Sequence, residues 1–154
     1  MEVIDATRAR AESVIRLLEH ENEKYLGGAS GFYCNRGIIR RSARESRMRC
    51  FKVDRSIAGF ATFTVYRKHS AIEIFEILPP FRGLGLGRQL AMYMIDLLLS
   101  MGLSHISVEC APQSTEPFWR KVGFESNEGV GKPFGNPKLI LRSTPNFDSH
   151  ATTH

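Results

Sequence analysis

Cysteine is scarce in this sequence, and long apolar runs are absent from it. The 154 residues include three cysteines, Cys34, Cys50 and Cys110, and no two of them form a Cys-x-x-Cys pair. Three thiols cannot all pair within one molecule, and such usage suits a reducing cytoplasm. No run of about eighteen apolar residues is present to cross a bilayer, and residues 1–5 lack the basic and apolar regions of a signal peptide. We therefore expect a cytoplasmic protein without a membrane partner.

Histidine is also thinly spread, which argues against a metal site. The five histidines lie at positions 20, 69, 105, 150 and 154, and no spacing among them suits shared metal ligation. We expect no metal. With 42% hydrophobic residues, a chain of this length can bury one core and hardly two. We expect a single domain over residues 1–142, followed by a flexible polar tail over residues 143–154.

The most informative segment is a glycine-rich turn between an apolar strand and a helix, at residues 71–88. Gly83, Gly85 and Gly87 lack Cβ atoms, so their amides can approach a ligand closely. The first turn of the following helix adds unpaired N–H groups and the positive end of the helix dipole, which suits a diphosphate. The alternating glycines do not fit the Gly-x-Gly-x-x-Gly spacing of a dinucleotide fold. Gly131-Lys132 lacks the first glycine of a P-loop.

Two blocks of sequence carry a family resemblance. The pattern Arg82-x-x-Gly85-x-Gly87, preceded by Ile77-x-Pro79, resembles the pyrophosphate loop of the GNAT superfamily of acyl-CoA-dependent N-acetyltransferases. Residues 114–124 resemble the helix and following strand that complete the coenzyme site of that family. The resemblance implies an acyltransferase that uses acetyl-CoA as cosubstrate and an amine as acceptor. The alternative for the first block is an ordinary glycine-rich turn between a strand and a helix.

Apolar periodicity predicts the order of secondary structure. Strands are expected over residues 2–6, 49–54, 57–67, 71–78, 105–110 and 138–142. Helices are expected from an N-cap at Thr7 to about Gly27, from Leu86 to Gly102, and over residues 116–122. Residues 28–49 form either a short helix or a loop. This order is similar to the GNAT fold, an α/β fold of mixed α+β type, with a mostly antiparallel mixed sheet and helices on both faces.

The resemblance places the coenzyme along the strand that precedes the glycine-rich turn. The pantetheine arm pairs with main-chain groups of residues 75–77, and an amide near Phe75 serves as the oxyanion donor. The diphosphate lies on the amides of residues 82–88. The residues that the resemblance assigns to acetyl-CoA are Phe75, Glu76, Ile77, Arg82, Gly83, Leu84, Gly85, Leu86, Gly87, Arg88, Ser114 and Phe118.

Two carboxylates are candidates for the base that deprotonates the acceptor, because an amine with a pKa of roughly 10.4 is an ammonium ion at neutral pH. Strict alternation puts Glu73 on the same strand face as Phe75 and Ile77, with Glu76 on the opposite face in a structural role. Ala71 occupies the position of the glutamate in histone-acetylating members. Glu109 resembles the glutamate of ribosomal-protein-acetylating members. The alternative for each candidate is an exposed charge or a surface ion pair.

Trp119 stands where the family often has a tyrosine that protonates the departing thiolate. An indole N–H donates a hydrogen bond but is no proton source near neutral pH. A thiol with a pKa near about 8.5 is a tolerable leaving group without an acid, so we expect Trp119 to be a packing residue. Cys110 suggests a covalent thiol route, but no His or Asn forms a motif with it, so direct attack is preferred.

Arginines gather in residues 36–49, which hold six arginines and one acid, Glu45. In the family this segment borders the acceptor entrance, so it can attract an acidic peptide, a phosphorylated metabolite or RNA. A solvated basic face, or a subunit contact in a homodimer, is the alternative. Two other functions stay open at this stage. One is a CoA-binding sensor or scaffold without catalysis, and the other is a toxin-like acetylation of aminoacyl-tRNA.

Overall fold

The computed structural model describes residues 2–24, 33–127 and 135–144. The predicted end of the first helix near Gly27 lies outside these residues, as does nearly all of the predicted tail. Within the described ranges, no helix has both the length and the apolar character that a membrane crossing requires.

The predicted fold class is confirmed, because the seven strands of the described ranges form one mixed, mostly antiparallel sheet in the order β1-β2-β3-β4-β5-β7-β6. Only the central β4–β5 pair among the described strands is parallel. The strands are β1 Glu2–Asp5, β2 Met48–Val53, β3 Ser56–Tyr66, β4 His69–Ile77, β5 His105–Glu109, β6 Glu125–Ser126 and β7 Lys138–Arg142. The two-residue β6 was not predicted from periodicity, although the resemblance of residues 114–124 implied a strand after the helix.

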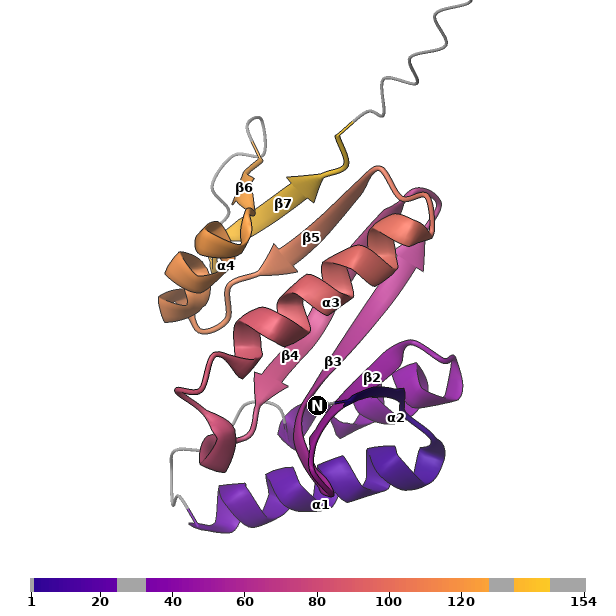
Figure 1. The fold of residues 1–154 in the computed structure, drawn as a ribbon, viewed down its shortest axis with the longest axis vertical. Coiled ribbons are helices and arrows are strands. Elements are labelled where there is room, and N and C mark those ends of the chain that lie inside the picture. The colour runs from indigo at the N-terminus through magenta and orange to yellow at the C-terminus, as the bar shows by residue number, and fades with distance from the viewer. Residues whose placement is uncertain (1, 25–32, 128–134, 145–154) are drawn as a thin grey trace, which may run out of the picture.

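Within the described residues, four helices accompany the sheet (Figure 1). They are α1 Arg8–Lys24, α2 Arg36–Arg44, α3 Leu86–Ser100 and α4 Glu116–Val122, with short 3₁₀ turns η1 Tyr33–Asn35, η2 Pro79–Phe81 and η3 Gln113–Thr115. Helix α2 resolves the alternative of helix or loop after residue 28. The predicted N-cap is confirmed, since the Arg10 amide donates to Thr7 Oγ1 at 3.3 Å.

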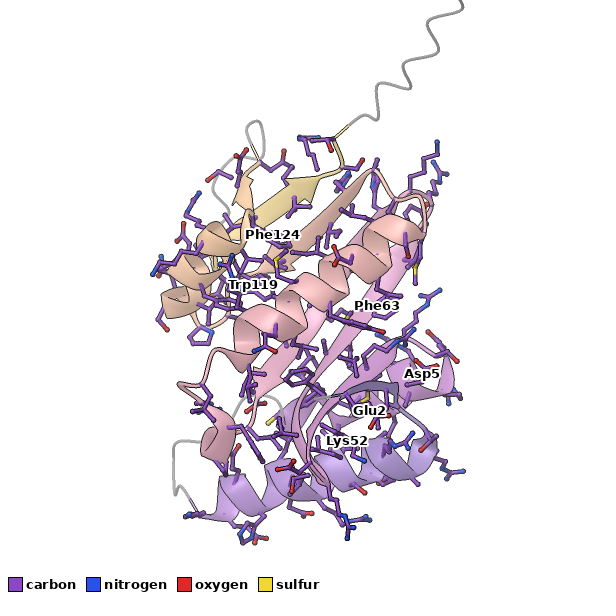
Figure 2. All side chains as sticks on the ribbon, viewed as in Figure 1. Glu2, Asp5, Lys52, Phe63, Trp119 and Phe124 are labelled. Atoms are coloured by element: carbon purple, nitrogen blue, oxygen red, sulfur yellow. The ribbon has the colours of Figure 1, made fainter. Side chains whose placement is uncertain are left out.

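The expectation of one core is wrong, because each face of the sheet has its own cluster of buried apolar residues. On one face, α3 and α4 pack with Phe63, Ile72 and Phe124. Figure 2 shows Trp119 and Phe124 close together beside α4 in this core. On the other face, α1 and α2 pack with Phe60 and Ile74. The buried face of α3 includes Ala91, Ile95 and Leu98, whereas Met101 just after the helix is 45% exposed.

The predicted strict alternation along β4 is wrong at Glu73. In the register with β3, Ile72 pairs with Phe63 and Ile74 pairs with Thr62, so Glu73 is an additional residue in a β-bulge. As a result, Ile72 belongs to the α3/α4 core although Ile74 belongs to the α1/α2 core. Phe75 and Ile77 return to the α3/α4 side. The bulge therefore turns Glu73 away from the face that strict alternation assigned to it.

Adding one methyl group should have opposite effects on stability at two glycines, Gly59 and Gly37. A Cβ atom at Gly59 in β3 would lie 2.6 Å from the Glu76 carbonyl oxygen and 2.7 Å from Ile77 Cδ1. Gly37 in α2 is exposed and has no atom within 4 Å of a Cβ position. We expect Gly59→Ala to lower the free energy of unfolding by about 1–3 kcal/mol through overpacking. We expect Gly37→Ala to raise it by about 0.5–1 kcal/mol through helix propensity.

Urea denaturation of the two variants and the wild type measures both effects. A Gly59→Ala protein as stable as the wild type would show that β3 and β4 can separate at no cost.

Candidate functional site

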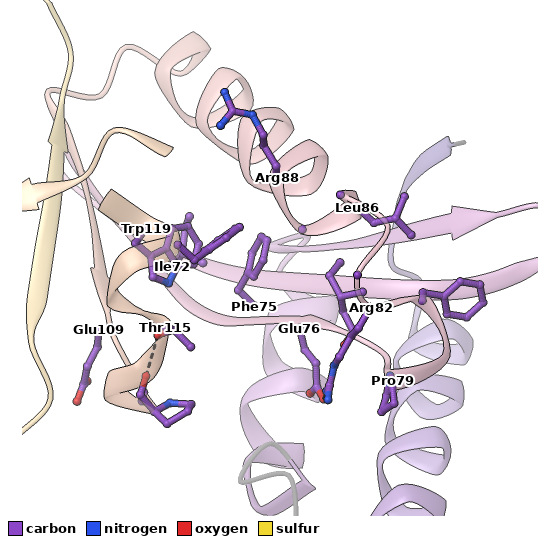
Figure 3. Close-up of a pocket in the computed structure, with 18 of the residues that line it drawn as sticks. Ile72, Phe75, Glu76, Pro79, Arg82, Leu86, Arg88, Glu109, Thr115 and Trp119 are labelled. Carbon is purple, nitrogen blue, oxygen red and sulfur yellow. Dashed lines mark hydrogen bonds and ion pairs between the residues drawn. The ribbon is translucent and has the colours of Figure 1, made fainter. Parts of the chain in front are cut away.

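The site begins where the parallel pairing of β4 and β5 stops. The two strands pair from His69 opposite His105 to Ile72 opposite Val108, and the structure describes no pairing between them beyond that point. β5 instead continues against β7, with Glu109 opposite Lys138. A cleft of about 1400 Å³ opens between the diverging strands (Figure 3). Main-chain groups at this edge of β4 therefore face a cleft and not a neighbouring strand.

The glycine-rich turn borders this cleft at the start of α3. Gly83 and Gly85 have φ values of 78° and 76°, in the left-handed region that favours glycine. Gly85 is the N-cap of α3, and no side chain caps the helix. The first amides of α3, from Leu86 to Arg88, have no partner within the helix, which suits an anion.

Gly87 differs from the two glycines before it, because neither its backbone conformation nor its packing requires glycine. Its φ is not positive, and a Cβ atom there would lie 3.5 Å from Cε2 of Phe118 in α4. That distance is an ordinary van der Waals contact, so a methyl group would fit between α3 and α4 at this position, and both helices border the cleft.

Arg82 ties the glycine-rich turn to the end of β4. Its Nε donates to the Ile77 carbonyl at 2.8 Å, and its Nη2 lies 3.2 Å from Glu76 Oε1. The Arg82 amide donates to the Pro79 carbonyl at 3.2 Å, so this amide is already used within the protein. The amides of residues 83–88 are therefore the ones left for the predicted diphosphate.

Glu76 is a buried carboxyl group beside the cleft. In Figure 3, Phe75 points to one side of β4 and Glu76 to the other, where its carboxylate meets the Arg82 guanidinium. The Glu76 side chain is 2% exposed, and its Oε2 atom has no hydrogen-bond partner. Burial, reinforced by the nearby Glu21 carboxylate, raises the pKa of Glu76 to about 7 against the effect of Arg82.

The two predicted base candidates lie on the two strands that diverge around the cleft, Glu73 on β4 and Glu109 on β5. Glu73 forms an ion pair with Arg41 of α2, with Nη2 and Oε2 3.3 Å apart. Glu109 is exposed at the end of β5 and lines the cleft, as does Glu73. The structure therefore brings both carboxylates to the same cleft, although the bulge directs Glu73 toward α2.

Trp119 is held in an aromatic cluster at the base of α4. It makes edge contacts with Phe75, Phe118 and Phe124, at ring-centroid distances of 4.9, 5.0 and 5.2 Å. It is 5% exposed, as expected for a packing residue. Cys110 is fully buried outside the cleft lining, and burial raises the pKa of its thiol.

Most of the predicted coenzyme residues line the cleft, but Leu84 and Ser114 do not. Leu84 is 67% exposed, and Ser114 is an exposed residue of η3. The cleft also contains residues that the sequence analysis did not select, namely Glu21, Asn35, Ile72, Pro79, Phe81, Ala111, Pro112 and Thr115. For Glu21 a signal was present, since it follows the buried Leu18 by three residues and shares its helix face.

Half of the six arginines in residues 36–49 form ion pairs with acids. Arg40 lies 2.7 Å from Glu12, and Arg49 lies 2.9 Å from Asp5. With the Arg41–Glu73 pair, three of the six arginines are in ion pairs. The segment therefore presents much less free positive charge than its sequence indicates.

The raised pKa of Glu76 makes the stability of the protein depend on pH. The folded state favours the protonated Glu76 carboxyl. Its contribution to the free energy of unfolding is therefore fully present below about pH 4.5 and is lost as pH rises through about 7. We expect the wild type to lose about 3 kcal/mol of unfolding free energy over this range that Glu76→Gln does not lose. Urea denaturation of both proteins near pH 5 and pH 8 measures the difference, and parallel pH profiles would contradict it.

Solved structures of acetyltransferases share this fold. The PaiA N-acetyltransferase of Thermoplasma acidophilum, determined with coenzyme A, superposes with a TM-score of 0.73 at 12% identity, over 92% of this chain and 98% of that one. Ard1 of Thermoplasma volcanium superposes with a TM-score of 0.72 at 17% identity, over 93% and 97%. A ribosomal-protein-alanine N-acetyltransferase of Brucella melitensis has a TM-score of 0.67 at 16% identity, over 93% and 100%.

No curated protein matches the sequence. The family model described as "Acetyltransferase (GNAT) family" matches residues 10–124, well over half of the chain. This range includes the glycine-rich turn, the diverging strands β4 and β5, and the aromatic cluster of α4. The protein therefore belongs to the GNAT family of acetyltransferases, acyltransferases that use acetyl-CoA as cosubstrate.

Proposed function

We propose that this enzyme transfers the acetyl group of acetyl-CoA directly to a primary amine, in the cleft between β4 and β5. Family membership implies acetyl-CoA and an amine acceptor. The observation that carries the proposal is the cleft itself. It is bordered by the unpaired edge of β4, by the uncapped N-terminus of α3 and by a carboxylate from each of β4 and β5. The expectation that no metal takes part stays a prediction.

Acetyl-CoA binding rests on main-chain groups. The amides of residues 83–88 suit the diphosphate, and the β4 edge at residues 75–77 suits the amide-containing pantetheine arm. The amide near Phe75 is the proposed donor to the thioester oxygen as that oxygen gains charge. Leu84 and Ser114 have less support than the other predicted residues, because neither lines the cleft.

The acceptor must lose a proton before its nitrogen can attack the thioester carbon. Glu73 and Glu109 are the proposed acceptors of that proton, directly or through water. As the new C–N bond forms, the nitrogen loses its second proton to solvent. As the C–S bond breaks, the CoA thiolate leaves with the electron pair and takes a proton from solvent. Trp119 supplies none, and the Thr115 hydroxyl already donates to the Pro112 carbonyl at 2.8 Å.

A covalent route through Cys110 has no support, since the thiol is fully buried and its pKa is raised. The alternative of acetylating aminoacyl-tRNA relied on the arginine-rich segment. The ion pairs of Arg40, Arg41 and Arg49 remove much of that argument. A homodimer contact at this segment stays a prediction.

The first prediction of this proposal concerns the diphosphate site. Gly85→Val places a β-branched side chain at a left-handed position of the turn and should displace the first amides of α3. Loss of one hydrogen bond to a charged group corresponds to an affinity for CoA lower by about 10- to 100-fold. Isothermal titration calorimetry measures this affinity.

Gly102→Val is the matched control, because Gly102 has the same φ of 76° at the other end of α3. It carries the same backbone strain away from the cleft and should bind CoA as the wild type does. Equal affinity in a folded Gly85→Val protein would remove the diphosphate assignment.

The second prediction concerns the base. Glu73→Gln or Glu109→Gln keeps the side-chain shape and removes the proton acceptor, so amine-dependent release of CoA should fall by about 10²-fold or more. CoA affinity should be unchanged. Glu125→Gln, on exposed β6 outside this cleft, is the control for loss of one negative charge. Full activity of both cleft variants would assign proton removal to another group.

A further inference from the structure

Two carboxylate oxygens beside the cleft are buried and have no hydrogen-bond donor. They are Oε2 of Glu76 in β4 and Oε1 of Glu21 in α1. Both residues line the cleft that holds the proposed reaction site. A buried acceptor without a donor costs free energy, so the pair indicates a ligand that brings donors.

The charges around the pair define what kind of donor fits. Glu76 and Glu21 carry up to two negative charges, and the Arg82 guanidinium offsets one of them at 3.2 Å from Glu76 Oε1. On α1, Lys24 also acts on Glu21. The nearby Glu73 is neutralised by Arg41. The Arg82 ion pair thus offsets one of up to two negative charges, and two carboxylate oxygens between α1 and β4 have no donor.

An alkylammonium group meets both requirements, since it has three N–H donors, one positive charge and no acceptor. A carboxylate in the same place would bring acceptors and a like charge. Resting on the proposed acetyltransferase function, we propose that Glu21 and Glu76 together bind the ammonium group of a cationic acceptor, an alkylamine without a carboxylate beside its nitrogen. This acceptor class differs from the acidic one that the arginine-rich segment indicated.

The surroundings of Glu76 support this assignment. Its register partner in β3 is Phe60, and its own face of β4 also carries Ile74, so the carboxyl group lies in the apolar α1/α2 core. A charge there destabilises the fold unless it is paired, and Arg82 reaches only one of the two Glu76 oxygens. Burial raises the pKa of both carboxyls, so ammonium binding should weaken as pH falls below about 7 and Glu76 becomes protonated.

The test measures binding separately from catalysis. Pentylamine and norleucine are the probes, since norleucine is pentylamine with a carboxylate on the carbon that bears the nitrogen. Each is titrated by calorimetry into the CoA-saturated protein at pH 8. We expect pentylamine to bind at least tenfold more tightly than norleucine, and Glu21→Gln or Glu76→Gln to weaken it by about 10- to 100-fold.

Glu23→Gln is the matched control. Glu23 is an exposed residue of the same helix, two positions from Glu21, and it lies outside the cleft lining. Its replacement makes the same change in net charge and should leave pentylamine binding unchanged. If Glu76→Gln does not fold, Glu21→Gln carries the comparison, because Glu21 is only partly buried.

The outcomes separate the two proposals. Three results would overturn the ammonium site. They are no binding of pentylamine, pentylamine binding by Glu21→Gln and Glu76→Gln as tight as by the wild type, or norleucine binding as tight as pentylamine binding. Release of CoA from acetyl-CoA by wild-type protein with a broad panel of amines tests the proposed function independently. If the protein acetylates some amine while Glu21→Gln and Glu76→Gln bind pentylamine as tightly as the wild type, the acetyltransferase function is supported and only this acceptor class is removed.

Discussion

The end of the parallel pairing between β4 and β5 is the constraint on which the rest of the site depends. After Ile72 and Val108, β5 stays with β7, while the bulge at Glu73 changes the direction of β4. Strand edges carry main-chain donors and acceptors that need partners. Where the two strands diverge, β4 has no described strand partner on the side of the cleft. η2 and the glycine-rich turn lead from β4 into α3, so an uncapped helix N-terminus borders the same cleft as the unpaired edge.

Arg82 connects the two functional sides of the cleft. Its side chain binds the last carbonyl of β4 and the buried Glu76 carboxylate, while its backbone begins the glycine-rich turn. The position that resembles a diphosphate-binding residue thus has a second task, which is to stabilise a charge in the α1/α2 core. The left-handed glycines that follow it let the chain turn at once from this anchor into α3.

Where the family often has a proton-donating tyrosine, this chain has Trp119, which packs in an aromatic cluster. Phe75 of β4 and Phe118 of α4 contact the indole and line the cleft, so the wall near the proposed thioester position is apolar. An apolar wall strengthens electrostatic interactions within the cleft because it excludes water from one side. The departing thiolate then depends on solvent at the open side of the cleft.

Sequence alone determined those features that depend on neighbouring residues. The glycine-rich turn was readable because left-handed backbone at Gly85 and free amides at a helix start are local properties. The strands and the Thr7 cap followed from periodicity and propensity for the same reason. The family pattern then supplied the sheet that these elements form.

Tertiary structure decided what distant segments do to one another. The bulge at Glu73 arises from pairing with β3, so alternation within β4 could not predict that Ile72 and Ile74 enter different cores. The ion pairs of Arg40, Arg41 and Arg49 removed charge that composition had counted as free. Glu21 meets the cleft only because α1 packs across the sheet from α3. Burial and charge pairing are sums over residues far apart in the chain, and only the folded arrangement sets them.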